Sequence, residues 1–464
     1  MSNRISFHFD ISERKIFLRI IDIAAVLAAL HLIGLLFNYD YFKITREHWT
    51  WPVILVVYLL FFATIFEMYN LQRASRISAT LRSVISTGSI VSLLYLFTPV
   101  ITPPLPQNRL EILYFWLVLT IALLLWRTVY IKLFASSRFN KKILILSSPQ
   151  EASMVASSFK EVDPNYYIAG FVNTGNLSNV NNQVAGVQEI SIKSANKLVK
   201  KGQVNEIVVA GSNFSVFNDD LYKWLLKLLD RGYNIREFTQ VYEEITDRVP
   251  VEFIKKDFYK YFPFSRNNQN RLYRVYHRAF DIVTGLVGII VGVILLPIII
   301  FGNLIGNRGP LFYSQKRLGK NRKTFRIYKY RTMVVDAENA GAKYATKNDA
   351  RITRFGKFMR KTRLDEFPQF YNILIGEMSI IGPRPERPVF VKELSQKIPF
   401  YTTRNVVKPG LTGWAQVMAK YGETDEDHMT KLQYDLYYIK KRSIFLDIRI
   451  IVKTISSVVF FKGQ

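Results

Sequence analysis

Four long apolar stretches dominate the first third of the chain, at about residues 17–37, 51–69, 81–101 and 112–134. Each approaches the roughly 20 residues that an α-helix needs to cross a bilayer. The pattern therefore predicts a membrane domain of four transmembrane helices over residues 1–139. A cleavable signal peptide is the alternative for the first stretch, but no small-residue cleavage site follows it.

Basic residues between these stretches indicate how the predicted helices are oriented. The connection between the second and third stretches carries Arg73, Arg76 and Arg82, whereas the other two connections are mixed or nearly uncharged. Positively charged connections stay on the cytoplasmic side of a membrane. We therefore expect both ends of the helical bundle to face the cytoplasm.

Between residues 140 and 250 the pattern changes to short apolar runs separated by amphipathic segments, which is typical of an α/β domain. The first predicted strand leads into Ser147–Glu151, where a dinucleotide-binding fold would carry glycines that let the backbone approach a pyrophosphate. These glycines are absent. The pattern indicates a degenerate Rossmann-like domain, and a structural or regulatory role is favoured over nucleotide binding.

A fifth apolar run, residues 279–305, follows a polar connector at residues 251–278 and contains Pro297. Clusters of Lys and Arg flank both ends of this run. If the run crossed the membrane, the basic segment after it would be exported against the positive-inside bias. Because proline lacks an N–H and bends a helix, we predict a re-entrant membrane helix that returns to the cytoplasmic face.

The last segment, residues 306–464, is polar and basic and is expected to form a helix-rich catalytic domain in the cytoplasm. It closes with an amphipathic stretch at residues 444–461. That stretch either lies on the membrane surface or packs on the core of its own domain.

The composition excludes some classes of chemistry but does not identify the binding partner. The net charge of +27 suits nucleic acid, anionic lipid or phosphorylated substrates, because all three present dense negative charge. The chain has no cysteine, which excludes thiol nucleophiles, disulfides and thiolate metal sites. Its five histidines are scattered without the spacing of a zinc site.

Two adjacent carboxylates, Asp365 and Glu366, lie amid basic residues. Adjacent positions on a helix diverge by about 100°, so the two side chains are expected to have different tasks. An ionised carboxylate can attack phosphorus to form an acyl phosphate, and a second can hold a Mg²⁺ ion that neutralises a pyrophosphate. Alone, such a pair is more often a solvated helix start or an N-cap.

Basic residues before and after this pair favour phosphate chemistry. Arg384 stands between Pro383 and Pro385, and prolines that fix the backbone around an arginine can present it as a bidentate fork for phosphate oxygens. Upstream, a dense run of Lys and Arg includes Lys329 and Arg331. Such a run is more often a solvated or lipid-facing surface.

Together these segments resemble the polyprenyl-phosphate sugar-phosphate transferases, also called monotopic phosphoglycosyl transferases. The resemblance covers the chain from about residue 278 to its C-terminus. It rests on six segments: 312–315 (FYSQ), 329–333 (KYRTM), 364–369 (LDEFPQ), 376–385 (GEMSIIGPRP), 408–416 (KPGLTGWAQ) and 434–438 (YDLYY). More loosely, four helices followed by an α/β domain look like the long form of the family, which initiates exopolysaccharide or capsule assembly.

The resemblance implies a two-step reaction. Asp365 attacks the phosphate that bears the sugar and expels a nucleoside monophosphate, and a lipid phosphate then takes the sugar phosphate from the enzyme. The implied substrates are a UDP-hexose and undecaprenyl phosphate, a polyprenyl phosphate lipid. The same resemblance places the protein in the bacterial inner membrane as a homodimer, and nucleic acid is not among the expected partners.

The resemblance also implies roles for individual residues. Glu366 is expected to bind Mg²⁺, and Arg384 with its flanking prolines to hold nucleotide or phosphate. Further candidates for substrate contact or polar support are Lys329, Arg331, Gln369 and Asp435.

Two other classes of function remain open. A membrane-bound sugar-nucleotide dehydratase or epimerase would need an intact glycine loop and a catalytic Tyr-x-x-x-Lys motif, and the loop is missing. A non-catalytic lipid-binding scaffold fits the positive charge but leaves the Asp365–Glu366 pair without a task. Release of a nucleoside monophosphate that depends on Mg²⁺ would separate these alternatives.

Overall fold

The computed structural model divides the chain into two compact units, Met1–Ile245 and Thr246–Gln464. The basic residues Arg73 and Arg76, and most of the predicted connector, lie outside the described residues. The structure describes residues 11–37, 39, 42, 48–69, 74, 77–99, 101–106, 108–134, 141–162, 166–174, 183–184, 186–210, 219–253, 270–337, 341, 349–419, 422 and 424–459.

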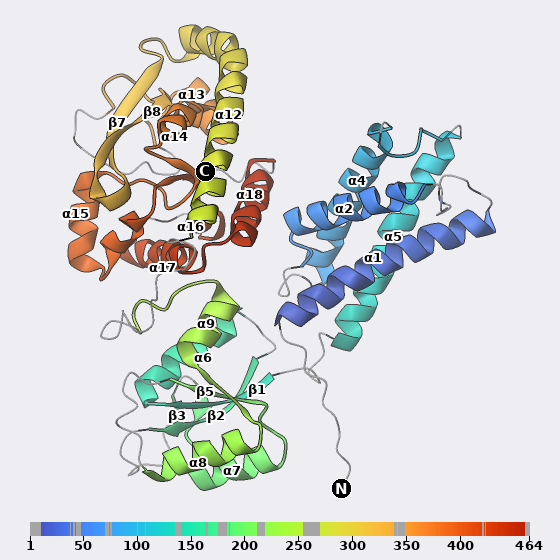
Figure 1. Cartoon of the computed structure of the whole chain (residues 1–464), viewed down its shortest axis with the longest axis vertical. Coiled ribbons are helices and arrows are strands. Elements are labelled where there is room, and N and C mark those ends of the chain that lie inside the picture. Colours follow the sequence, from blue (N-terminus) through green and yellow to red (C-terminus); the bar gives the residue numbers. More distant parts are fainter. Residues whose placement is uncertain are drawn as a thin grey trace. The chain divides into compact units, whose positions relative to one another are not determined.

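The first unit begins with a bundle of four apolar helices (Figure 1): α1 (Ile11–Leu36), α2 (Thr50–Ile65), α4 (Ile77–Phe97) and α5 (Arg109–Phe134). Their buried side chains, including Leu18, Leu59, Val84 and Leu119, form one continuous core. Within this bundle α1, α4 and α5 are long and apolar enough to cross a membrane. These three helices confirm that three of the four apolar stretches predicted in this part of the chain form helices long enough to span a membrane.

The second predicted span is the exception. Helix α2 has 16 residues, or about 24 Å, which is shorter than a hydrocarbon core of about 30 Å. It ends at Ile65 because Glu67 adopts a left-handed backbone conformation with φ of 57°. The apolar pattern continued to Tyr69, so hydrophobicity alone overestimated the length of this helix.

The rest of the first unit is an α/β fold with a four-stranded parallel sheet of order β2-β1-β5-β6. In β1, Leu144 and Leu146 share a core with α7 and α8, and Figure 1 shows α6 and α9 on the opposite face of the sheet. The predicted α/β character is confirmed. The elements are β1 (Lys141–Ser147), α6 (Pro149–Val162), β2 (Tyr166–Asn173), β3 (Gln183–Val184), β4 (Val187–Gln188), α7 (Ile192–Lys200), β5 (Glu206–Val209), α8 (Asp219–Asp230), β6 (Asn234–Glu237) and α9 (Phe238–Thr246).

The turn between β1 and α6 is occupied by protein groups. The Glu151 carboxylate accepts hydrogen bonds from the Ser148 backbone N–H at 3.1 Å and from the Ser148 hydroxyl at 2.9 Å. A negative side chain therefore sits at the helix start where a dinucleotide-binding fold places a pyrophosphate. The degenerate Rossmann-like character of the domain stays a prediction.

The second unit combines one long apolar helix with a compact helix-rich fold. Its elements are α12 (Arg271–Gly306), β7 (Phe312–Leu318), η4 (Lys320–Arg322), β8 (Thr324–Tyr330), α13 (Arg354–Thr362), η5 (Leu364–Glu366), α14 (Gln369–Ile375), β9 (Ser379–Ile381), α15 (Pro388–Lys397), η6 (Tyr401–Val406), β10 (Gly410–Thr412), α16 (Trp414–Met418), α17 (Asp425–Lys441) and α18 (Ile444–Val459). Strands β7 and β8 form an antiparallel hairpin, and β9 pairs with β10 in parallel.

Helix α12 is the fourth helix that is long and apolar enough to cross a membrane. It begins at Arg271, inside the segment interpreted as a connector, because the Asn270 side chain caps the backbone N–H groups of Leu272 and Tyr273. Pro297 lies within the helix. Figure 1 shows the C-terminal part of α12 turning away from the axis of its longer N-terminal part.

The final amphipathic stretch forms α18, which packs on the core of its own unit. Leu446 and Ile450 are buried in that core, and the buried Asp447 accepts hydrogen bonds from Tyr273 at 2.8 Å and Tyr438 at 3.1 Å. A second face of α18 stays apolar and exposed, with Phe445 82% accessible. Helix α18 therefore packs on the core of its own unit, as one of the two predicted alternatives states, and also presents an exposed apolar surface.

Candidate functional site

The two adjacent carboxylates lie on a tight turn between two helices. Helix α13 ends where Arg363 takes a left-handed conformation with φ of 61°, and the chain then forms the 3₁₀ turn η5 before α14 begins. Asp365 and Glu366 are each 7% exposed. The pair is therefore part of the interior rather than a solvated helix start.

Two cations neutralise Glu366. The Lys329 Nζ, at the end of β8, lies 2.8 Å from the Glu366 Oε1, and the Arg384 Nη2, after β9, lies 3.1 Å from the same oxygen. Burial alone would raise the pKa of Glu366, but the charges of Lys329 and Arg384 outweigh it and hold that pKa below its ordinary value. Three segments of the chain thus meet at one ionised carboxylate.

Asp365 has a different environment. Within the described part of the chain it makes no hydrogen bond or ion pair. Burial and the neighbouring charge of Glu366 raise its pKa to about 6, although Lys329 and Arg360 oppose the shift. A carboxylate that is close to cations but bound to none can act as a nucleophile once it is ionised.

The backbone that leads into Arg384 is held by the segment around β10. The Gly382 N–H donates to the Thr412 carbonyl at 2.9 Å, and the Gly410 N–H donates to the Pro383 carbonyl at 2.9 Å. A side chain at Gly382 or Gly410 would overlap the facing backbone, so glycine is required for this close approach. The arginine is consequently presented from a rigid segment.

Behind this segment lies a buried ion pair that the sequence did not indicate. The Arg404 Nη2 lies 2.7 Å from Asp435 and donates to the backbone carbonyl of Arg384 at 3.2 Å. Burial raises the pKa of Asp435 to about 6, against the effect of Arg404. Arg404 thus links Asp435 to the backbone of Arg384, and a supporting role of Asp435 in the reaction stays a prediction.

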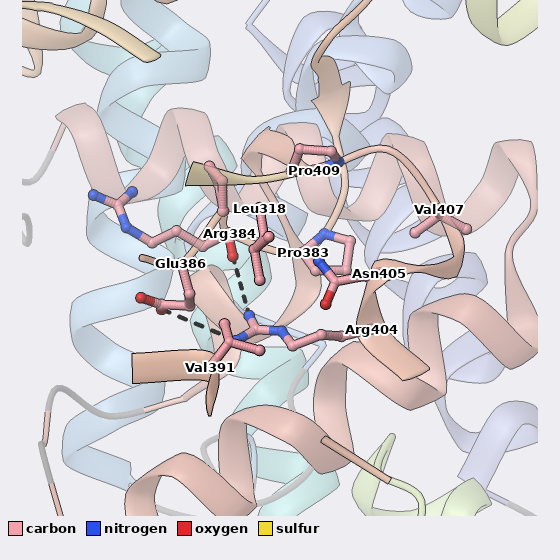
Figure 2. Close-up of a pocket in the computed structure, with 10 residues that line it drawn as sticks. Leu318, Pro383, Arg384, Glu386, Val391, Arg404, Asn405, Val407 and Pro409 are labelled. Carbon is pink, nitrogen blue, oxygen red and sulfur yellow. Dashed lines mark hydrogen bonds and ion pairs between the residues drawn. The ribbon is translucent and has the colours of Figure 1, made fainter. Parts of the chain in front are cut away.

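Figure 2 shows Arg404 beside a small pocket that includes Pro383, Arg384 and Glu386 in its lining. The guanidinium of Arg404 reaches the Arg384 carbonyl and Glu386, whose Oε1 is 4.0 Å away. The guanidinium of Arg384 points away from Arg404. Arg384 is thus free to serve the carboxylate pair while Arg404 fixes its backbone.

Two other candidates occupy positions that sequence could not define. Arg331 donates to the carbonyls of Pro310 at 2.7 Å, Met333 at 2.8 Å and Asn307. Its guanidinium therefore closes the end of α12, and phosphate contact by Arg331 stays a prediction. Gln369 is 3% exposed at the start of α14, and its Nε2 has no partner within the described residues. Contact of Gln369 with a substrate stays a prediction.

Comparison with known proteins decides the family. A model of the bacterial sugar transferase family matches residues 272–461, which contain the site described above. The exopolysaccharide production protein PSS of Rhizobium leguminosarum bv. phaseoli is 38% identical over 195 residues, which are 39% of this chain and 94% of that protein. The chain belongs to the bacterial sugar transferase family.

The chain also matches parts of two further relatives. The UDP-N-acetylgalactosamine-undecaprenyl-phosphate N-acetylgalactosaminephosphotransferase of Aeromonas hydrophila is 38% identical over 220 residues, which are 47% of this chain and 51% of that relative. The UDP-glucose:undecaprenyl-phosphate glucose-1-phosphate transferase of Xanthomonas campestris pv. campestris is 47% identical over 163 residues, 34% of each chain. The matches thus span about half, or less, of these two relatives.

Proposed function

We propose that this sugar transferase moves a hexose 1-phosphate from a UDP-sugar to a polyprenyl phosphate such as undecaprenyl phosphate, with release of UMP. The observation that carries the proposal is the buried, unpaired Asp365 next to a Glu366 that is bound by Lys329 and Arg384. The names of the relatives support the substrate class. The product would start the assembly of an exopolysaccharide or capsule repeat unit.

The proposed reaction has two balanced steps. An oxygen of Asp365 bonds to the phosphorus that bears the sugar, while the bond from that phosphorus to the bridging oxygen breaks and UMP leaves with the electron pair. An oxygen of the lipid phosphate then attacks the same phosphorus and returns Asp365 as a free carboxylate. Lys329 and Arg384 stabilise the negative charge that develops on the phosphoryl oxygens.

A Mg²⁺ ion held by Glu366 is part of the proposal. No group of three His, Asp or Glu side chains that could form a metal cage occurs in the described residues. The Asp365–Glu366 carboxylates nevertheless fit Mg²⁺, which is usually bound by one or two carboxylates together with substrate phosphates and water. When bound, the ion would neutralise the pyrophosphate. Glu366→Gln is expected to raise the Mg²⁺ concentration needed for activity.

We further propose that α12 is re-entrant and that the second unit faces the cytoplasm, at the inner membrane. The helix has 36 residues, about 54 Å, and contacts the second unit near its start, middle and end. Tyr273 binds Asp447, Gly288 contacts Phe370, and Ile299 packs with Met359. A helix that crossed the membrane perpendicularly would place much of this polar unit in lipid.

Two finer features of the molecule belong to the same proposal. The parallel order β2-β1-β5-β6 and the glycine-free turn support a Rossmann-like domain without a dinucleotide. The homodimer is proposed from the family resemblance, and light scattering of the detergent-solubilised protein would measure it.

Release of UMP tests the proposed function. Purified protein is mixed with Mg²⁺, undecaprenyl phosphate and each of a panel of UDP-sugars, and UMP is quantified. A UDP-sugar without lipid should give a burst of about one UMP per enzyme and leave labelled sugar phosphate on the protein. A dehydratase, epimerase or scaffold would release no UMP, and turnover without burst or label would exclude the covalent intermediate.

A further inference from the structure

Helix α12 lays a row of glycines against the elements that surround the carboxylate pair. Gly285, Gly288 and Gly292 are buried, and their spacing of three and four residues places them on one face of the helix. Residues on other faces, such as Val287 and Val291, are exposed. The glycine face therefore meets protein while the remaining surface is available to lipid.

The contact is closest at Gly288. A Cβ at Gly288 would overlap the ring of Phe370, so this ring lies directly on the helix backbone. At Gly285 a Cβ would be 2.8 Å from Leu374, and at Gly292 it would make an ordinary contact of 3.4 Å with Phe367. The interface therefore has no space for a side-chain Cβ at position 288, whereas a Cβ fits at position 292.

The ring on Gly288 is connected to the carboxylate pair. Phe370 meets Phe367 edge to face with a centroid distance of 5.6 Å, and Phe367 directly follows Glu366 in the chain. On the other side of the pair, Leu364 packs against the apolar cluster that contains Ile299 of α12 and that Phe367 also contacts. Leu364 and Phe367, which flank Asp365 and Glu366 in the chain, therefore both pack against a cluster that includes α12.

The opposite side of α14 is also fixed. Asn372 accepts from the Tyr328 N–H at 3.2 Å and donates to the Arg326 carbonyl at 2.7 Å, which ties α14 to β8. Strand β8 carries Lys329, the partner of Glu366. Because α14 is held between β8 and α12, a displacement at Gly288 cannot be absorbed by a free movement of α14.

We propose that Gly288 is a positioning residue of the reaction: its lack of a side chain sets the place of Phe370, and through Phe367 the geometry of Asp365 and Glu366. This inference rests on the proposed function. The apolar helix α12 then takes part in aligning the nucleophile, because Phe370 and Phe367 lie against its glycine face.

Gly288→Ala is the direct test in the full-length protein, assayed as UMP release with Mg²⁺, undecaprenyl phosphate and the best UDP-sugar. Since misplacement by about 1 Å can cost about a hundredfold in rate, kcat should fall by about that factor with little change in KM. Alanine is a better helix former than glycine, so loss of the helix would not explain such a fall.

Two companion variants control for packing. Gly292→Ala makes the same change one turn further along, where the Cβ fits, and should retain kcat within about threefold of wild type. Gly288→Ala combined with Phe370→Ala removes the overlapping ring and should recover much of the rate. Wild-type kcat in Gly288→Ala, or a folded double variant as slow as the single one, would overturn the inference.

Hydrogen exchange separates this inference from the proposed function. Mass spectrometry of peptides that cover residues 364–370 should show faster exchange in Gly288→Ala than in wild type and in Gly292→Ala. Unchanged exchange in this segment would refute the positioning role even if no UDP-sugar were turned over. Absence of UMP release from wild type, with the exchange difference present, would reject the function and leave the structural coupling intact.

Discussion

Asp365 and Glu366 are neighbours in the sequence, but their carboxyl groups meet opposite electrostatic conditions. Lys329 and Arg384 hold Glu366 in its ionised form, whereas burial and the charge of Glu366 raise the pKa of Asp365 to about 6. Adjacent groups whose pKa values are pushed apart commonly have separate tasks. At neutral pH both are ionised, and only Asp365 is free of a cationic partner in the described residues.

The raised pKa of Asp365 predicts a pH dependence. The attacking form is the carboxylate, so kcat/KM should be high above pH 6 and should fall as the pH drops through about 6. The measurement is initial UMP release across this range, with thermal unfolding recorded at each pH as a control for stability. A flat profile through pH 6 would show that ionisation of Asp365 does not limit the rate.

Removal of the charge on Asp365 should abolish the reaction. Asp365→Asn keeps the shape of the side chain but replaces the negatively charged carboxylate by a neutral amide, so both turnover and the burst of UMP without lipid should disappear. Asp336→Asn, at an exposed acidic residue of the same unit, is the matched control. Activity of Asp365→Asn within about tenfold of wild type would end the assignment of this residue as nucleophile.

Sequence identified the residues proposed to meet the substrate more readily than the residues that hold them in place. Asp365, Glu366 and Arg384 stand in short motifs whose chemistry can be inferred locally. The partner of Asp435 could not be found in this way, because Arg404 reaches it only through the fold. The contacts of Arg331 were equally hidden: its place in a basic run of the sequence does not indicate that its guanidinium donates to three backbone carbonyls.

At the scale of elements, hydrophobic pattern predicted where helices occur better than where they end. The run from Trp51 to Tyr69 exceeds α2 because the left-handed backbone at Glu67 is a local event that hydropathy does not record. The start of α12 at Arg271 depends on the Asn270 cap rather than on the apolar residues. The parallel sheet was easier to predict, because its buried strands appear as short, continuous apolar runs.

The helical bundle contains an ion pair that predicts a stability effect. Arg127 of α5 and Asp22 of α1 are almost fully buried, with their nearest atoms 2.6 Å apart. Asp22→Ala would leave Arg127 without its partner and should destabilise the bundle by about 3–5 kcal/mol. The apparent Tm in detergent measures this effect, and Arg82→Ala, at an exposed position of α4, is the control.

A double variant distinguishes loss of the pair from loss of packing. Asp22→Leu with Arg127→Leu removes both charges, so it should be more stable than Asp22→Ala alone. If Asp22→Ala unfolded at the wild-type temperature, the pair would have no stabilising role.

At the scale of the whole molecule, the family match and the candidate chemistry both lie in the second unit. Of the four helices among the described residues that are long and apolar enough to span a membrane, three lie in the first unit. The fourth, α12, belongs to the second unit and contacts the rest of that unit along much of its length. The side of the membrane on which α12 begins and ends therefore decides where the reaction takes place.

The two topologies of α12 differ in one measurable property. A helix that crosses would place residues 274 and 320 on opposite sides of the membrane, and Asp365 would lie away from cytoplasmic nucleotide sugars. A re-entrant helix, bent at Pro297, returns both positions to the same side. The cysteine-free chain permits single cysteines at each position without a background of native thiols.

We predict that Arg274→Cys and Lys320→Cys both label only from the cytoplasmic side. Both positions are exposed, and neither substitution disturbs the Asn270 cap or the left-handed Asn321. The measurement is reaction with a membrane-impermeant maleimide in intact cells and in inverted vesicles, with UMP release confirming that each variant stays folded. Labelling of position 320 in intact cells, with position 274 protected, would establish a crossing and move the site to the outer face.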